Sequence, residues 1–142
     1  MKRFLLFVFL IILVAMTIST CDKGKNDKEK IPYLPISIDN VSYIGLYGNS
    51  SSREATQQEI IQIVDWLNSI KEYDSKIDIP QNSNGRPVPS SIRVFLKDTA
   101  YSKSPYILER DNDAIIICIP ETKKGYVVNQ PELDHLLKEL RK

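Results

Sequence analysis

The sequence predicts one α+β domain, in which two helices cover one face of a mostly antiparallel sheet of about four or five strands. Apolar residues recur at helical spacing over about 56–72 and about 130–141. Short β-rich segments separated by turn residues lie before and between them, in the order β-α-β-β-β-β-α. Strands joined by short turns pair antiparallel, so the helices are expected on one side. We place this domain at residues 36–142.

The first β-rich segment is ISIDNVSYIGLY, residues 36–47. Two sets of apolar residues alternate in it: Ile36 with Ile38, then Val41 with Tyr43 and Tyr47. Asp39-Asn40 shifts the phase between the two sets. This shift predicts a β-bulge or a break into two short strands.

The helix at about 56–72 has the clearest start signal in the chain. Thr56-Gln-Gln-Glu59 is a capping box, in which each end residue binds the backbone N–H of the other. Apolar residues then follow on one face: Ile60, Ile63, Val64, Leu67 and Ile70. Ile61 and Trp66 are expected to widen this buried stripe.

Four further strands are expected at 75–79, 91–97, 106–110 and 114–119. In the second of these, Ile92 and Val94 face one way while Arg93 and Phe95 face the other. The last two form a hairpin across Asp111-Asn-Asp113. Five consecutive apolar residues at 115–119 predict a central strand that is buried on both faces.

The final helix is expected over about 130–141. Asn129 is its expected cap, and Pro131 suits its first turn. Its buried stripe consists of Leu133, Leu136, Leu137 and Leu140. A turn at Lys123-Lys-Gly125 is predicted to precede it.

The first 20 residues have the layout of a signal peptide. Lys2 and Arg3 precede an unbroken apolar run from Phe4 to Ala15, and a short, less apolar stretch from Met16 to Thr20 leads to Cys21. As a helix, the 15 residues from Phe4 to Ile18 would be only about 22 Å long. The hydrocarbon core of a bilayer is about 30 Å thick, so a permanent span would require local thinning.

Ile18-Ser-Thr-Cys21 resembles a bacterial lipobox, the motif that directs lipidation of its cysteine. Thr20 departs from the pattern, because Gly, Ala or Ser usually occupies that position. The resemblance implies that Cys21 carries a thioether-linked diacylglycerol and becomes the mature N-terminus. The alternative is an ordinary signal peptide that happens to precede a cysteine.

Residues 21–35 are expected to form the lipidated cysteine and a polar tether. Asp22–Lys30 contains no apolar residue, and its lysines alternate with acids. Without residues 1–20 the chain has 17 basic and 18 acidic residues. This balance does not favour a nucleic-acid partner.

No motif for catalysis, for a cofactor or for a metal stands out, and we expect a protein that is not an enzyme. His135 is the only histidine and lies off the leucine stripe, so it should be solvated. Cys118 lies in an apolar run and should be buried and unreactive, although a Cys21–Cys118 disulfide is possible without lipidation. Asp111-Asn-Asp113 lacks the rest of a calcium loop and indicates a turn.

The one mild excess is of tyrosine, at positions 33, 43, 47, 73, 101, 106 and 126. Tyrosines on an exposed face can stack on sugars or anchor a protein, but they are also common in strands. We therefore expect a membrane-anchored binding or accessory domain with a protein or cell-wall partner. The alternative is an envelope hydrolase that uses paired carboxylates.

The whole layout resembles small lipoproteins of Gram-positive bacteria. The resemblance rests on the lipobox-like signal, the lysine-rich tether, Thr56-Gln-Gln-Glu59 and the segment YVVNQPEL at 126–133. It implies attachment to the extracytoplasmic face of the cell membrane. It carries no activity with it.

Overall fold

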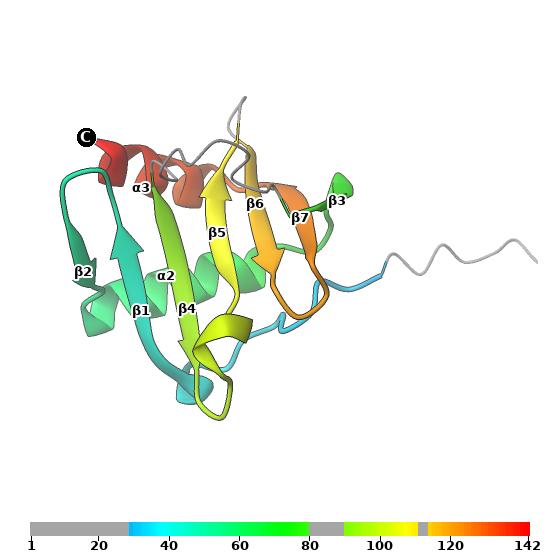
Figure 1. Cartoon of the computed structure of the whole chain (residues 1–142), viewed down its shortest axis with the longest axis horizontal. Helices are drawn as coiled ribbons and strands as arrows, with labels where there is room; N and C mark the ends of the chain where they lie inside the picture. Colours follow the sequence, from blue (N-terminus) through cyan, green and yellow to red (C-terminus); the bar gives the residue numbers. More distant parts are fainter. Residues whose placement is uncertain (1–28, 80–89, 111–113) are drawn as a thin grey trace, which may run out of the picture.

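A seven-stranded antiparallel sheet with two helices on one face makes up the domain (Figure 1). The computed structural model describes residues 29–79, 90–110 and 114–142. The sheet order is β2-β1-β4-β5-β6-β7-β3. The elements are β1 Val41–Tyr47, β2 Ser52–Glu54, α2 Gln57–Ser69, β3 Ser75–Asp78, β4 Ser91–Leu96, β5 Tyr106–Glu109, β6 Ala114–Ile119, β7 Lys124–Asn129 and α3 Pro131–Arg141. The predicted α+β class is confirmed, but the sheet has more strands than expected.

The two unexpected strands are β2 and β7. Strand β2 reads Ser-Arg-Glu and is fully exposed, so it has no apolar periodicity; it pairs with β1 through the backbone. Strand β7 begins at Lys124 because the turn after β6 comes earlier than predicted, with Lys123 at a φ of 56°. Strands β2 and β3 form the two edges of the sheet.

The start of the first β-rich segment differs from the prediction. Ile36 is buried, but Ile38 is 37% exposed because residues Ile38–Asn40 form the 3-10 turn η1 instead of a strand. The pairing register of β1 with β4 then shifts between Val41 and Tyr43. This irregularity turns Val41 toward the helix-covered core and Tyr43 toward the opposite face.

Residues 31–36 pack against the domain, so packed chain begins earlier than the expected boundary at residue 36. Ile31 is only 6% exposed and belongs to the main core, and Leu34 packs against the same core. The peptide bond from Leu34 to Pro35 is cis. The last residues of the expected tether are therefore packed on the domain.

Helix α2 begins as predicted. The Thr56 hydroxyl accepts a hydrogen bond from the Glu59 backbone N–H, and the Glu59 carboxylate accepts one from the Thr56 N–H. The helix ends at Ser69 rather than at about 72. Trp66 packs against the core and widens the buried stripe as predicted. The prediction is wrong for Ile61, which is 41% exposed.

Helix α3 is capped by Gln130, not by the expected Asn129. The Gln130 side-chain oxygen accepts a hydrogen bond from the Glu132 N–H. Its amide nitrogen donates to the Trp66 carbonyl and to the Ser69 hydroxyl, both at 3.0 Å. One buried side chain thus joins the start of α3 to the end of α2.

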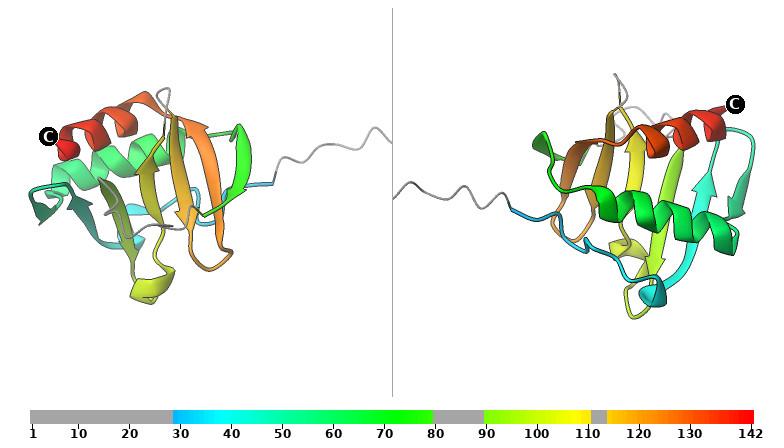
Figure 2. Two further views of the ribbon diagram at one scale, coloured as in Figure 1. Left: turned by 45° about the horizontal axis from the view of Figure 1, so that its top comes forward. Right: turned by 180° about the vertical axis from the view of Figure 1, so that it is seen from behind.

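Both helices lie on the same face of the sheet (Figure 2). The core between them and the sheet contains Ile44, Leu46, Ile92, Leu133 and Leu137, all at zero exposure. A smaller cluster on the other face contains Leu108, Ile116, Cys118 and Val127. Strand β6 contributes to both clusters, which confirms the prediction of a central strand buried on two faces.

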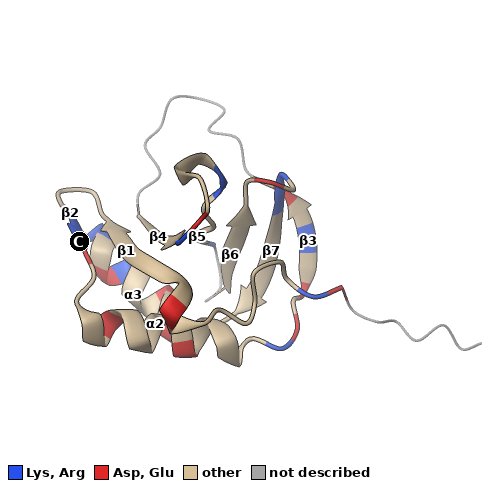
Figure 3. Ribbon diagram, turned by 90° about the horizontal axis from the view of Figure 1, so that it is seen from below, with Lys and Arg blue, Asp and Glu red and all other residues tan. Residues whose placement is uncertain are grey.

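Helix α2 carries acidic residues only, whereas α3 and the strand β3 carry charges of both signs (Figure 3). Among residues 29–79, 90–110 and 114–142, no helix is long and apolar enough to cross a membrane. Residues 1–20 and Cys21, with most of the tether, lie outside the described residues, as does the predicted turn Asp111-Asn-Asp113.

Candidate functional site

Four of the seven tyrosines gather on the face of the sheet opposite the helices. They belong to β1, to the 3-10 turn η2 (Tyr101–Lys103) and to β5: Tyr43, Tyr47, Tyr101 and Tyr106. Figure 3 shows η2 on the side of the sheet away from α2 and α3. We call these four tyrosines, with Arg93 and Phe95 of β4, the aromatic face.

The rings of the aromatic face form a continuous row. Tyr43 stacks on Phe95 with a centroid distance of 4.1 Å, and Phe95 lies 5.0 Å from Tyr101. Phe95 is buried, whereas Tyr101 is 59% exposed. Ring contacts of this kind stabilise the rings against one another, and the outermost ring, that of Tyr101, stays accessible.

Arg93 lies between two of these tyrosines. Its guanidinium carbon is 4.9 Å from the Tyr101 ring centroid and 5.1 Å from that of Tyr106. A cation over an aromatic face is held by the quadrupole of the ring. The two contacts fix the guanidinium of Arg93 in place on a half-buried surface.

The hydroxyls of Tyr47 and Tyr106 have raised pKa values and stay protonated at neutral pH. Burial, with a smaller effect of Cys118, raises the pKa of Tyr106 to about 12. Burial also raises the pKa of Tyr47, with a further contribution from its hydrogen bond to Tyr101. The hydroxyls can therefore donate as well as accept hydrogen bonds.

The other three tyrosines do not join this face. Tyr126 is fully buried in the helix-covered core, and Tyr73 packs edge-on against it at 5.1 Å. The Tyr33 hydroxyl donates to Glu121 at 2.7 Å near the start of the domain. The tyrosine excess therefore divides into one surface group and three structural residues.

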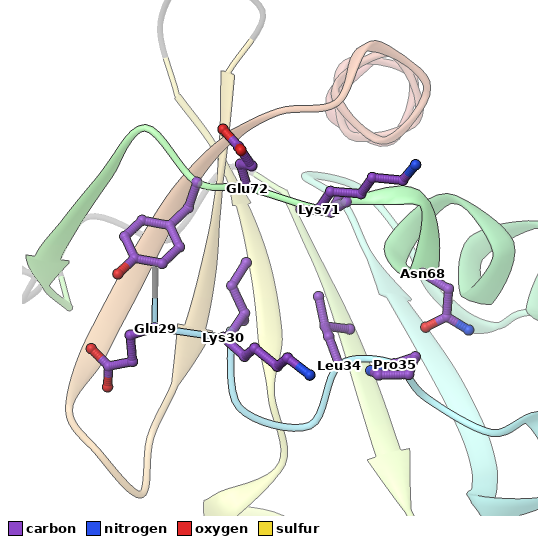
Figure 4. A pocket seen from close by; sticks show the side chains of 10 residues that line it. Glu29, Lys30, Leu34, Pro35, Asn68, Lys71 and Glu72 are labelled. Atoms are coloured by element: carbon purple, nitrogen blue, oxygen red, sulfur yellow. The ribbon is translucent and has the colours of Figure 1, made fainter. Parts of the chain in front are cut away.

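A cavity of about 280 Å³ lies where the chain enters the domain, between residues 29–35 and 68–73 (Figure 4). Its charged side chains do not converge: Lys30 extends toward Pro35, while Lys71 and Glu72 point away from Lys30. Glu29 pairs with Lys76 at 2.7 Å. The cavity is thus a seam between two packed segments, with mixed charge at its rim.

Two largely buried carboxylates, one on α3 and one on β5, each pair with a cation on α3. Asp134 binds Lys138 at 2.6 Å, and Glu109 binds Arg141 at 3.2 Å. Both side chains are held by ion pairs that tie α3 to itself and to β5. In the described ranges no three or more metal-ligating side chains come together.

The structure places His135 and Cys118 as expected. His135 is 77% exposed at its side chain, on the outer face of α3. Cys118 is fully buried and unpaired, and burial raises the pKa of its thiol to about 11. A thiol with such a pKa is not a nucleophile at neutral pH.

Arg93 is the residue of the aromatic face that the sequence did not single out. Alternation along 91–97 already put it with Phe95 on the face away from the core. What the sequence could not give is the return of η2, which brings Tyr101 over Arg93. No family model, curated protein or solved structure matches this chain in the comparisons with known proteins.

Proposed function

We propose that this protein is a lipid-anchored, extracytoplasmic binding domain that acts on a protein or cell-wall partner and not as an enzyme. The observation that supports binding best is the aromatic face, where Arg93 lies between the rings of Tyr101 and Tyr106, beside the stacked pair Tyr43 and Phe95, on the side of the sheet opposite the helices. Tyr and Arg are enriched at binding surfaces. They combine a large contact area with polar groups that orient a partner.

The anchor in this proposal is Cys21. Cys21 would carry a diacylglycerol after removal of residues 1–20, and two acyl chains hold a protein stably on a membrane. Between Cys21 and Glu29 there are eight residue steps. Fully extended, they span at most about 28 Å. The domain would therefore work close to the lipid surface.

Intact-mass measurement of the membrane fraction tests the anchor. We expect a chain that starts at Cys21 and carries a diacylglyceryl group, and we expect Cys21→Ser to be released or misprocessed. Thr20→Ala serves as the matched variant, because a smaller side chain at the cleavage position should speed maturation. A soluble secreted product without lipid would refute the anchor.

Site-specific crosslinking tests the binding surface. A photo-crosslinking amino acid at position 101 should capture a partner from intact cells, because Tyr101 is exposed on the aromatic face. The same group at position 61 is the control, since Ile61 is exposed on the helical layer. Equal capture at both positions, or none at 101, would contradict a role for the aromatic face.

A further inference from the structure

We propose that the aromatic face is a site for carboxylate-bearing sugars, in which Arg93 binds the carboxylate and the tyrosine rings stack on the sugar. This inference deepens the proposed binding function and rests on it. It commits to one partner chemistry, an acidic glycan. Three properties of the face support this choice: an arginine without an acidic partner among the described residues, flat accessible rings, and strands β1 and β4 that are each paired on both sides.

The first property is the free charge of Arg93. Among the described residues, Arg93 forms its contacts with two aromatic rings and has no hydrogen bond or ion pair with a carboxylate. The rings occupy positions over the cation, but they do not satisfy its N–H donors. A guanidinium has five such donors in a planar fork that fits a carboxylate bidentately.

This arrangement differs from that of the other arginines with described partners. Arg53 binds Glu59, and Arg141 binds Glu109. Arg93 is the arginine that is held by rings alone on a half-buried surface, where a charge-assisted hydrogen bond is stronger than in open water. A carboxylate of the ligand would accept hydrogen bonds from the Arg93 N–H donors that no carboxylate among the described residues accepts.

The second property is the row of rings beside the cation. The exposed ring of Tyr101 lies next to both Phe95 and Arg93. The C–H face of a pyranose can pack on such a ring, and the neighbouring hydroxyls of Tyr47 and Tyr101 can bind sugar hydroxyls. Tyr101 and Arg93 thus lie close enough together to offer a stacking ring and a cation to the same ligand.

The third property argues against an extended peptide as the ligand. A peptide that adds to a sheet needs an unpaired strand edge. Strand β1 is paired on both sides, with β2 and β4, and β4 is paired with β1 and β5. The ligand must therefore lie on side chains alone, which suits a ring-shaped ligand better than an extended backbone.

Calorimetric titration of the full-length chain in detergent micelles tests the proposal. The probe is a tetrasaccharide of alternating N-acetylglucosamine and N-acetylmuramic acid with free lactyl carboxylates. The neutral control is chitotetraose, which has the same backbone without carboxylates. We expect the acidic tetrasaccharide to bind about ten-fold to a hundred-fold more tightly, the range given by a hydrogen-bonded charge pair.

Variants assign this preference to the site. Arg93→Gln should abolish the difference between the two sugars, and Arg93→Lys should restore little of it because an ammonium lacks the planar fork. Arg110→Gln removes the same charge from an exposed position and should keep the preference. Tyr101→Ala, at a surface position where folding is not at risk, should weaken binding of both sugars, whereas Tyr101→Phe should weaken it less.

The outcomes separate this inference from the proposed function. Equal affinity for both sugars, or a preference that survives Arg93→Gln in a folded protein, would overturn the carboxylate site. Failure of both sugars to bind, with a protein captured at position 101, would overturn the glycan inference and keep the binding function. Failure of both tests would overturn both.

Discussion

Asn68 holds both backbone groups of Ile36. The Ile36 N–H donates to the Asn68 side-chain oxygen at 2.7 Å, and the Asn68 amide donates to the Ile36 carbonyl at 2.8 Å. The side-chain amide of α2 thus binds the N-terminal segment as a neighbouring strand would. This pair of bonds fixes the segment that carries Ile31 and Ile36 into the core.

Asn68→Ala should lower the free energy of unfolding by about 1–3 kcal/mol, because two hydrogen bonds of the N-terminal segment are lost together. Urea denaturation measures this change. Gln62→Ala is the control, since Gln62 is exposed on the same helix. Equal stability of the two variants would mean that the Asn68 bonds do not hold the segment.

Leu67→Asp should unfold the domain, because Leu67 is buried under the sheet and an unpaired charge cannot be accommodated there. An aspartate at an exposed position of the same helix, Ile61→Asp, should leave the melting temperature almost unchanged. Circular dichroism during heating measures both. If Leu67→Asp melted with the wild type, α2 would have to lie elsewhere.

Stability should fall at acid pH through Glu59. Its pKa is lowered from 4.5 to about 2, chiefly by hydrogen bonds from Arg53. A carboxyl whose folded pKa is depressed contributes stability above its unfolded pKa, and this contribution is lost as the pH falls from about 4.5 toward 2. Urea unfolding of wild type and Glu59→Gln at about pH 6 and about pH 3 measures it. The difference in free energy of unfolding between wild type and Glu59→Gln should be smaller at the lower pH. A difference that does not change with pH would contradict the role of Glu59.

Cys118 should resist thiol reagents in the folded protein. Burial raises its pKa to about 11, so little thiolate is present at about pH 8. In a Cys21→Ser chain, Cys118 is the only thiol, and mass spectrometry after iodoacetamide treatment counts its modification. We expect labelling only in concentrated guanidinium chloride. Rapid labelling of the native protein would show that β6 opens.

The elements with strong local signals could be predicted from the sequence. The capping box at Thr56 and Glu59 starts α2 because it satisfies two backbone donors with neighbouring residues. The apolar run of β6 demanded burial on both sides, which only an interior strand provides. Both signals depend on residues close in sequence.

The elements that depend on distant partners could not. Strand β2 has no apolar side chain, and only its pairing with β1 makes it a strand. Gln130 replaces Asn129 as the cap because it also reaches the end of α2. The surroundings of Arg93 are the rings of Tyr101 and Tyr106, which belong to later elements, η2 and β5. Such contacts exist only after the chain has folded.

The two edge strands bear on how the protein behaves when it is crowded. Strand β2 has three residues with Arg53 and Glu54 among them, and β3 has four with Lys76 and Asp78. Short edges that carry charge are poor templates for another sheet to extend. A protein concentrated in two dimensions on a membrane meets its own copies constantly. If Cys21 anchors the protein as we propose, these edges would let many copies lie side by side on the membrane without joining into fibrils.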